Sequence, residues 1–595
     1  MIKKIFTFAF ILLISASLFA QEKPDTKYWI IFKDKGLFKN EGKIFPGTDA
    51  YNEAIALLSD RAIQRRLKVI PEENLIDFGD LPLELSYVSE IEKLGIDLIA
   101  KSKWLNGISA YLTKSQLEKV KKLDFVFQIK TVKKLYKQNI VSLAPVECGE
   151  HYNNNFFISK DIKNILNYGK SFDQMNQIDV PKVHNLGING KGVLVASFDD
   201  GFFWKNHEAL KELKVIEEFD FINKDENTAI EVNQKYTDTR EQGGHGTATF
   251  STMAGFKEGK LIGPAFNSEF LLAKTEYVAS ETPMEEDFWL EAAEWVESKG
   301  ADIITSSLIY KEFDKPYSEN SYKYENYDGK TCITTIAASR CAYLGIVVLN
   351  AMGNYYQTEI PSLGSAADGD TIISVGAVDS KGNIAYFSSN GPTSDGRTKP
   401  DVCAMGFNVF AAQKEGTDKY DLVGGTSFST PITAGVCALI LSAHPELTPL
   451  QVREALRMTA NNFANPNNIY GWGIINAYNA LLYYGMAWSN EAAFTRDEYG
   501  IKVSVSLASQ YLIDGNSVKI FYSADEGITF EEMNLIYIQG NDDGNKSGLY
   551  TAALKQYPVN TKLLYYFTAR NSNNEESVYP PNAHRNKIKC LSYNF

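Results

Sequence analysis

The stretch VLVASFDDGFFWKNH at residues 193–207 starts as an unbroken apolar run and ends on two aspartates and a glycine. Such a run, stopped by a turn signal, predicts a strand that is buried on both faces of a parallel sheet. Similar runs follow at 269–275, 301–307, 345–351 and 371–378. Helical patterns occur at 289–300, 331–345 and 429–443. This alternation predicts an α/β domain with a doubly wound, mainly parallel sheet, in which ligands bind at the carboxyl ends of the strands.

The flanking regions have different periods. The N-terminal region reads as strand, helix, two strands around Asn106-Gly107, a helix after the Thr113 cap, and a strand, which is a split βαβ module of ferredoxin-like type with an extra charged segment at 36–80. The last hundred residues alternate apolar and polar side chains, which predicts an all-β sandwich. The expected domains are a signal peptide at 1–20, a ferredoxin-like α+β domain at 25–140, the α/β domain at 165–485 and a β-sandwich at 490–595.

Length, charge and the N-terminus limit the class of protein. The chain has 595 residues and a formal charge of −13, which argues against nucleic acid or an anionic membrane as its main partner. Residues 1–20 carry two lysines, a short apolar run and a final Ala20, which indicates a cleaved signal peptide rather than a transmembrane anchor. The six cysteines have no metal-ligand spacing. We therefore expect a secreted or periplasmic monomer with no membrane span after signal removal and no metal site.

Three short segments carry residue types used in nucleophilic catalysis. They are SFDDG at 197–201, GGHGTATFSTMAG at 243–255 and GGTSFSTPITAG at 424–435. A serine hydroxyl needs a base to accept its proton, and a histidine base needs a carboxylate to orient it. Ser427, His245 and Asp199 supply these groups. Ser427 starts a predicted helix and can offer its backbone N–H to an oxyanion, and the amide of Asn354 is the candidate for a second donor.

Taken singly, each segment is typical of a helix start, a turn or a cap. Taken together, they make the region from about 181 to 485 resemble the subtilisin-like serine peptidases, the subtilases. The family's aspartate motif is matched at 197–201 with its downstream histidine at His207, and its histidine motif at 245–247 with Ala254-Gly255. Its serine motif is matched without a gap at 425–435, and Asn354 corresponds to its oxyanion asparagine. The order Asp, His, Asn, Ser is also that of the family.

The resemblance implies an exported serine endopeptidase made as a zymogen and acting on a protein or peptide substrate. In this role Ser427 attacks, His245 transfers the proton, Asp199 orients the imidazole, and Asn354 binds the oxyanion. The ferredoxin-like domain is then an inhibitory prodomain, an intramolecular inhibitor, and the sandwich is a fibronectin type III-like accessory domain. No cofactor is required, but calcium is possible, with residues 541–548 as a weak candidate loop.

The sequence departs from the family pattern at two places. Thr249 and Phe250 replace the usual aliphatic and small residues, which predicts altered packing of that helix. The substrate-wall motif, usually Ser-Leu-Gly, contributes three of the four substrate-binding residues that the resemblance implies. These are Ser307, Leu308, Ile309 and Gly353. A branched side chain at 309 stands where backbone normally meets the substrate's P1 residue, so we expect a narrowed or blocked pocket.

Other classes and roles stay open at this point. The departures also fit an exported binding or scaffolding protein with a degenerate peptidase domain. A dinucleotide-binding dehydrogenase is disfavoured because the glycines at 187–192 precede the strand. Within the aspartate pair, side chains alternate along a strand, so we expect Asp199 alone to aim at the imidazole. Asp200 is expected to bond local backbone where the chain turns at Gly201.

Overall fold

The computed structural model describes residues 26–39, 43–131, 164–315, 317–498, 500–540, 546–581, 583 and 590–594. The predicted signal peptide at 1–20 and most of the candidate calcium loop lie outside the described residues.

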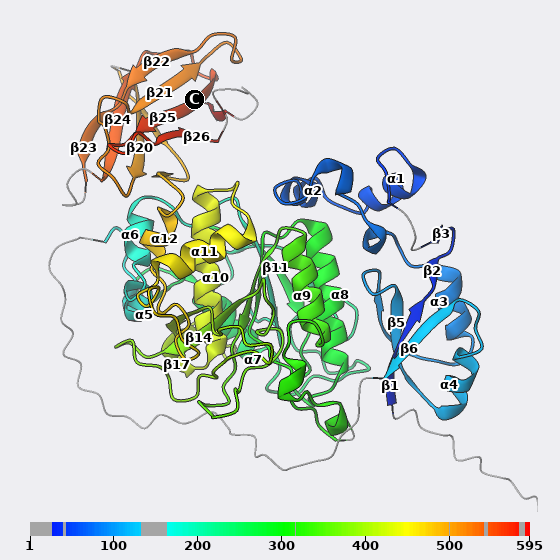
Figure 1. Ribbon diagram of the computed structural model, residues 1–595. Helices are drawn as coiled ribbons and strands as arrows, with labels where there is room; N and C mark the ends of the chain where they lie inside the picture. The colour runs from blue at the N-terminus through cyan, green and yellow to red at the C-terminus, as the bar shows by residue number, and fades with distance from the viewer. Residues whose placement is uncertain are drawn as a thin grey trace, which may run out of the picture.

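Seven parallel strands form the central sheet, in the order β15-β14-β13-β12-β7-β11-β8. In Figure 1 this sheet lies between α10 on one side and α8 and α9 on the other. Their bounds are β7 Leu194–Asp199, β8 Lys214–Asp220, β11 Glu269–Lys274, β12 Ile303–Ser306, β13 Val347–Ala351, β14 Ile373–Val378 and β15 Val402–Met405. Every neighbouring pair is parallel, which confirms the predicted α/β class. The two edge strands, β8 and β15, were not predicted, because β8 is rich in charged residues and β15 leads through Gly406 directly into the next apolar strand.

Helices cover both faces of this sheet because side chains alternate along each strand. On β7, Val195 packs into the core under α7 (Gly244–Ala254) and α10 (Thr426–Ala443). Phe198 packs into the opposite core, under α8 (Met284–Lys299) and α9 (Ile333–Tyr343). By length and composition α10 could cross a membrane, but it is entirely buried inside the protein.

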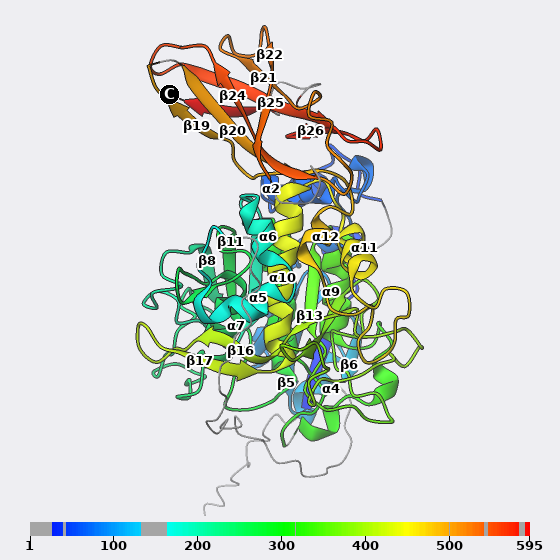
Figure 2. The same ribbon diagram turned by 90° about the vertical axis from the view of Figure 1, so that its left-hand side faces the viewer.

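Shorter elements complete the α/β domain. The helices are α5 Phe172–Asn176, α6 Val180–Asn185, α11 Pro449–Thr459 and α12 Ala477–Leu481. The strand pairs are β9 Phe256–Lys257 with β10 Leu261–Ile262, and β16 Phe407–Ala412 with β17 Tyr420–Gly424. Figure 2 shows α10 running the height of this domain, with the β16–β17 hairpin near its lower end.

The N-terminal unit is an antiparallel four-stranded sheet with strand order β4-β5-β1-β6. Its elements are β1 Thr26–Phe32, α3 Leu85–Glu92, β4 Leu98–Ser102, β5 Gly107–Leu112, α4 Lys114–Val120 and β6 Val126–Thr131. This is the predicted β-α-β-β-α-β order, and Thr113 caps α4 as expected. The extra segment folds as the short pair β2 Asp34–Lys35 and β3 Phe38–Lys39, followed by α1 Asp49–Ile55, α2 Asp60–Arg66, η1 Glu72–Asn74 and η2 Phe78–Asp80.

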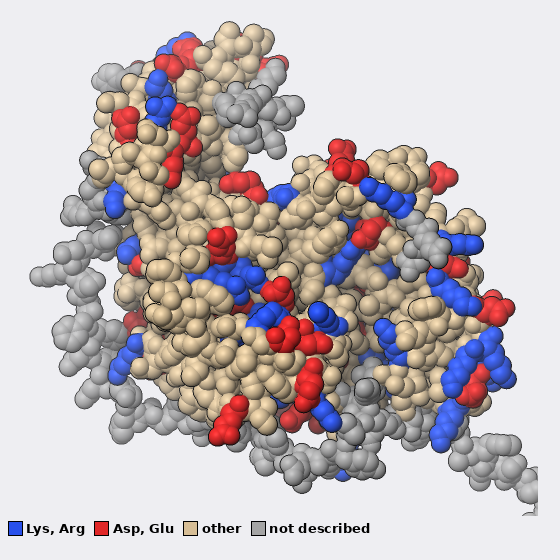
Figure 3. Space-filling model, in the orientation of Figure 1, with Lys and Arg blue, Asp and Glu red and all other residues tan. Residues whose placement is uncertain are grey.

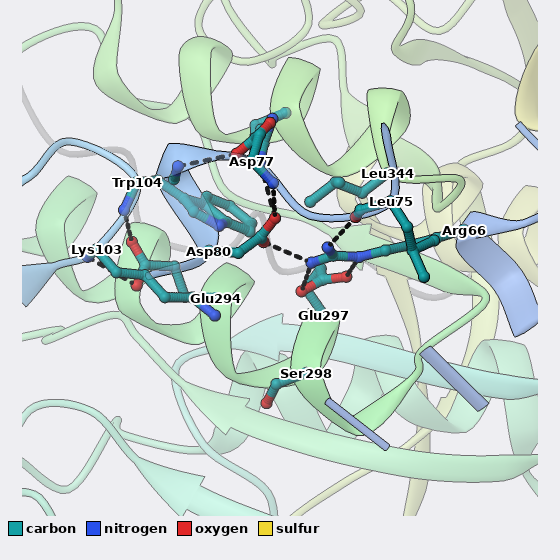
Figure 4. A network of polar contacts seen from close by, with 12 residues as sticks. Arg66, Leu75, Asp77, Asp80, Lys103, Trp104, Glu294, Glu297, Ser298 and Leu344 are labelled. Atoms are coloured by element: carbon teal, nitrogen blue, oxygen red, sulfur yellow. Dashed lines mark hydrogen bonds and ion pairs between the residues drawn. The ribbon is translucent and has the colours of Figure 1, made fainter. Parts of the chain in front are cut away.

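The extra segment attaches the N-terminal unit to α8 through buried charges. Figure 4 shows the guanidinium of Arg66 between the carboxylates of Asp80 and Glu297. Arg66 and Glu297 are fully buried and joined by two 2.8 Å hydrogen bonds, and Arg65 also pairs with Glu297. Nearby on α8, Glu294 accepts hydrogen bonds from the backbone N–H groups of residues 103 and 104. The N-terminal unit therefore lies along α8 and α9, as Figure 1 shows.

The C-terminal unit consists of two sheets that share one apolar core. One holds β18 Ala487–Trp488, β19 Ala493–Arg496, β20 Ile501–Ala508, β23 Ile536–Gln539 and β24 Ser547–Leu554. The other holds β21 Lys519–Ser523, β22 Glu531–Asn534, β25 Lys562–Arg570, β26 Glu576–Tyr579 and β27 Leu591–Asn594. The face in Figure 3 carries Lys/Arg and Asp/Glu side chains close to one another rather than one large patch of a single sign.

Candidate active site

The carboxyl end of β7 and the start of α7 bring Asp199 and His245 together. Asp199 is the last residue of β7, and its Oδ1 lies 2.7 Å from Nδ1 of His245, the second residue of α7. The carboxylate is 1% exposed and the imidazole 37% exposed, so the ring has one buried and one open side. This close approach requires glycine at Gly246, since a Cβ there would lie 2.2 Å from the carbonyl oxygen of Gly201.

The charge of Asp199 changes the proton affinity of this histidine. Burial lowers the pKa of His245, but the charge of Asp199 and its hydrogen bond outweigh that effect and raise it to about 9. A hydrogen bond on Nδ1 leaves Nε2 free to exchange a proton with a neighbouring group.

Asp200 has a different partner from the predicted one. Its Oδ1 accepts a 2.7 Å hydrogen bond from the backbone N–H of Gly246, so it holds the start of α7 rather than the local turn. The two carboxylates also diverge less than strand alternation predicts. Both carboxylates have an oxygen within 4.8 Å of a ring nitrogen of His245. Burial and the charge of Asp199 together raise the pKa of Asp200 to about 7.

Thr249 contacts Asp199, which the sequence did not predict. Its hydroxyl donates a 2.8 Å hydrogen bond to Oδ2 of Asp199, the oxygen that His245 does not use. Thr249 lies one helical turn after His245, so both side chains face the end of β7. The signal was present in the sequence, because a hydroxyl stands four residues after the histidine where the family has an aliphatic residue.

Ser427 and Asn354 meet at the start of α10. Ser427 is the second residue of this helix, where backbone N–H groups have no acceptor within the helix. Oδ1 of Asn354 accepts hydrogen bonds from the N–H and the hydroxyl of Thr426, so its amide nitrogen points elsewhere. A Cβ at Gly425 would lie 3.3 Å from that nitrogen, and the φ of Gly425 is +153°, so a glycine keeps this space open.

Ser427 is hydrogen-bonded to Ser307, and the residue after it packs on the ring of His245. Its Oγ donates a 3.3 Å hydrogen bond to the carbonyl of Ser307, whose own hydroxyl donates to the carbonyl of Ser427. The adjacent Phe428 packs on the imidazole, with 5.8 Å between ring centroids. Among the described residues no hydrogen bond joins Ser427 to His245.

Ile309 lies between two glycines of the same region. A Cβ at Gly364 would lie 2.2 Å from Cγ2 of Ile309, and one at Gly353 would lie 3.1 Å from its Cδ1. The side chain therefore fills the space between these two backbone segments. Leu308, the preceding residue, is buried in the core under α8 and does not share this space.

His207 lies outside this cluster. It is 1% exposed, its Nε2 hydrogen-bonds to the carbonyl of Lys419, and its ring packs edge-on against Tyr420. Its place in the fold is structural, at the β16–β17 hairpin.

A buried glutamine that no sequence motif indicates connects this site to the loop after β11. Nε2 of Gln242 donates to the backbone carbonyls of Asp200 and Glu276, and its Oε1 accepts from the N–H of Val278. Gln242 is fully buried, so the loop and the end of β7 are held as one unit.

Comparison with known proteins indicates the family of this chain. The subtilase family model matches residues 190–473, and a peptidase S8 propeptide domain of Bacteroidota matches residues 27–144. Serine protease AprX of Bacillus subtilis is 28% identical over 324 residues, which cover 49% of this chain and 67% of that protein. Subtilisin E of Bacillus subtilis and the subtilisin of Bacillus pumilus are each 30% identical over 305 residues, covering 51% of this chain and 69% and 95% of those proteins.

Among solved structures, a mutant of the epidermin leader peptide processing serine protease from Staphylococcus aureus is 19% identical, with a TM-score of 0.47 over 67% of this chain and 96% of that chain. The family model, the propeptide match and the related subtilisins all indicate the same family. The chain is therefore a member of the subtilase family of serine peptidases.

Proposed function

We propose that this subtilase is an exported endopeptidase made as a zymogen, with Asp199, His245 and Ser427 as its catalytic triad. The observation that carries the proposal is the 2.7 Å hydrogen bond between Asp199 and His245, with Ser427 at the adjacent start of α10. Export rests on the signal-like residues 1–20, which makes the site of action secreted or periplasmic.

In the proposed reaction the Oγ of Ser427 attacks the carbonyl carbon of a peptide bond while Nε2 of His245 takes its proton. Asp199 holds Nδ1 and stabilises the imidazolium that forms. The oxyanion is bound by the backbone N–H of Ser427 and the amide of Asn354. His245 then protonates the leaving amine, and water repeats the sequence to release the acyl group.

The substrate is a protein or peptide strand bound along Ser307 and Ile309 on one side and Gly353 on the other, whereas Leu308, which the resemblance also implied, is buried in the core under α8. The contacts of Ile309 with Gly353 and Gly364 support a short P1 pocket. We therefore assign a preference for Gly, Ala or Ser at P1.

We infer that the unit within 25–140 is the inhibitory prodomain and that 165–485 and 490–595 are the peptidase and accessory domains. The propeptide match at 27–144 and the buried Arg66–Glu297 contact support the first assignment. The accessory domain is fibronectin type III-like by its two-sheet pattern.

A fluorophosphonate probe tests the triad directly, because only an activated serine reacts. The processed protein is expected to be labelled and to hydrolyse casein, and the Ser427→Ala variant to do neither. Labelling that persists in Ser427→Ala, or an unlabelled and inactive parent, would favour a degenerate binding protein instead.

A further inference from the structure

We propose that residues 49–81 of the N-terminal unit form a separate holding segment, which binds the peptidase domain by itself and stays bound when the ferredoxin-like module leaves. The holding segment runs from α1 through η2 to Leu81, and the module is the four-stranded sheet with α3 and α4. This inference rests on the proposed zymogen, because it concerns the N-terminal unit after processing. It divides that unit into an inhibitory part and a part that remains in the working enzyme.

The holding segment has an apolar core of its own. Its buried side chains are those of Tyr51, Ala54, Leu58, Ala62, Ile76 and Leu81. The core of the module is a different set, made of Ile30, Phe32, Val88, Ile91, Ile96, Ile108, Ala110, Leu112 and Val120. A polar contact joins the two parts, because the ammonium of Lys35 on β2 donates to the backbone carbonyls of Phe78 and Leu81. Since burial of apolar surface is the main favourable term in folding, two separate cores allow the two parts to come apart.

Two adjacent arginines of α2 bind the holding segment to the carboxyl ends of α8 and α9. The guanidinium of Arg65 donates to the backbone carbonyl of Ala301 at 2.8 Å and to that of Leu344 at 3.1 Å. Arg65 and Arg66 both pair with the buried carboxylate of Glu297, and Figure 4 shows the Arg66 pair. The negative ends of two helix dipoles and one carboxylate therefore surround these cations. Charge-assisted hydrogen bonds are roughly twice as strong as neutral ones, so a small number of them holds a short segment.

Two glycines give the peptidase domain room for this segment. A Cβ at Gly300 would lie 2.7 Å from the backbone nitrogen of Ala62, and one at Gly345 would lie 3.0 Å from the carbonyl oxygen of Arg65. Both glycines follow their helices with a positive φ, +88° and +93°, which by itself also favours glycine. The backbone of α2 therefore approaches the ends of α8 and α9 more closely than any other residue there would permit.

The holding segment lies at the end of the sheet opposite to the proposed active site. Arg61 donates to the backbone carbonyl of Gly192 at 2.7 Å. It also pairs with Asp302 and Glu269. These three partners stand at the amino ends of β7, β12 and β11, and Figure 1 shows α1 and α2 above the sheet. Asp199 ends β7 at the other side, and a strand of six residues is about 20 Å long. Retention of the segment therefore leaves the catalytic residues uncovered.

The ferredoxin-like module contacts the opposite end of α8. Asp287, in the first turn of this helix, accepts hydrogen bonds from Nζ of Lys27 at 2.7 Å and from Nε1 of Trp29 at 3.0 Å. The hydroxyl of Ser109 donates to the same carboxylate. Asp287 and Glu297 are separated by about 15 Å along the helix axis. Because α8 follows β11, it starts at the carboxyl ends of the strands. The module, and not the holding segment, therefore lies at the end that carries the proposed active site.

Separation of the two parts requires two peptide bonds to be hydrolysed. One lies between β3 and α1, and the other lies between η2 and α3. Each hydrolysis consumes one water molecule and leaves a carboxylate and an amine, and the proposed endopeptidase activity supplies the reaction. Both connections are accessible, since Phe45 before α1 and Leu85 at the start of α3 are exposed.

The first test compares two matched variants of the full chain carrying Ser427→Ala, which cannot process itself. Lys27→Met removes the buried cation at the start of α8, and Arg65→Met removes one at its end. Hydrogen exchange is followed in β1, β5 and α2. We expect Lys27→Met to speed exchange in β1 and β5 by at least about a hundredfold and in α2 by less than about threefold. Arg65→Met should do the reverse.

Equal acceleration in β1, β5 and α2 in both variants would mean that the N-terminal unit opens as one body, and would overturn the proposal. Exchange in α10 is the control, because this helix is buried in the peptidase domain and should stay protected in both variants. If either variant fails to fold, the next experiment decides.

The second test uses the processed protein without substitutions. Intact masses are recorded under native and under denaturing conditions. We expect the native complex to contain a peptide that includes residues 49–81 and lacks β1 and β5, and the denatured sample to show this peptide as a separate chain. A processed protein that has lost residues 49–81 would overturn the proposal, and so would one that keeps β1 and β5 whenever it keeps residues 49–81.

The fluorophosphonate probe separates this proposal from the proposed triad. The species that retains the holding segment should be labelled as completely as the species from which the segment has been dissociated, because the segment lies at the far end of the sheet from Ser427. Labelling only after loss of the segment would overturn the proposal. Absence of labelling in every species would contradict the triad instead, and the exchange experiment, which needs no catalysis, would still decide whether the holding segment binds by itself.

Discussion

The hydroxyl of Thr249 donates a 2.8 Å hydrogen bond to the Oδ2 of Asp199, while Oδ1 of the same carboxylate faces His245. Both oxygens are therefore fixed, and the plane of the carboxylate cannot rotate away from the imidazole. In the proposed reaction Thr249 is a positioning residue, since it acts only through Asp199.

Thr249→Val keeps the shape of the side chain but removes the donor. Hydrogen bonds to charged groups contribute about 1.5–3 kcal/mol, so we expect kcat/KM to fall about tenfold or more, mostly in kcat. Without that donor, Asp199 attracts the imidazole proton more strongly, so the acidic limb of the pH–rate profile should move to higher pH. Thr249→Ser should restore both kcat/KM and the position of the acidic limb. If Thr249 acted through packing alone, Thr249→Val would leave the pH of the acidic limb unchanged.

Asp199 and Asp200 should respond differently to the same change. Asp199→Asn removes the charge that orients His245, and we expect kcat to fall by about 10⁴. Asp200→Asn keeps an oxygen that can accept from the Gly246 N–H, so we expect a loss under about tenfold. Steady-state kinetics on a peptide substrate measure both, and equal losses would mean that the pair acts as one unit.

The pH dependence follows from the raised pKa of His245. Only the neutral imidazole can act as a base, so kcat/KM of the processed enzyme should rise with unit slope and level off near pH 9. The free energy of unfolding changes with pH in the opposite direction to kcat/KM. Protonated His245 stabilises the native state below its unfolded pKa of 6.5, and that contribution is lost as the pH rises towards 9. A limb centred near 6.5 would contradict this account.

Ile309→Gly should open the P1 pocket. In the parent, peptides with Ala at P1 are expected to be cleaved faster than those with Phe or Leu. In the glycine variant, the ratio of kcat/KM for a Phe peptide to that for an Ala peptide should increase about tenfold or more. One methylene of space in an apolar pocket changes kcat/KM between two substrates by about that factor. Ile309→Val is the matched control and should change the ratio little. An unchanged ratio in the glycine variant would place P1 elsewhere.

Arg66→Ala should loosen the N-terminal unit. The substitution removes one of the two arginines that neutralise the buried Glu297. Breaking a buried ion pair in this way lowers the free energy of unfolding by about 3–5 kcal/mol. Hydrogen exchange on the Ser427→Ala chain should show at least about hundredfold faster exchange in α2. Arg61→Ala is the comparison, because the Arg61 side chain is 32% exposed in its ion pairs and should matter far less. Equal effects would refute a special role for the buried pair.

The sequence predicted those elements whose residue pattern is typical of a single kind of structure. Unbroken apolar runs predicted the central strands, because only strands buried on both faces need them. Strand β8 was missed because its KVIEEFD alternates with charge and its exposed face carries no buried apolar signal. Strand β15 was missed because its run VCAM leads through Gly406 directly into the apolar strand β16, so the pattern marks no separate strand.

Contacts between distant segments were beyond the sequence. The motifs placed Asp199 and His245 in one site, but the bond from Asp200 to Gly246 depends on how α7 packs on β7. The Gln242 link and the Ile309 contacts likewise depend on backbone segments far apart in the chain. The sequence predicted a narrowed pocket from Ile309 alone. Only the three-dimensional structure shows that Ile309 packs against Gly353 and Gly364.

The contact between Glu294 and the N-terminal unit makes separation of that unit a proton-releasing event. While covered, Glu294 is half-buried beneath residues 102–104, and the loss of water around its carboxyl raises its pKa to about 7 despite the hydrogen bonds it accepts. In water a glutamate has a pKa near 4.5. The covered state therefore holds more protons between these two values, so rising pH favours departure of the unit and falling pH favours its retention. The covering segment thus makes ambient acidity a variable in how long the N-terminal unit stays in place.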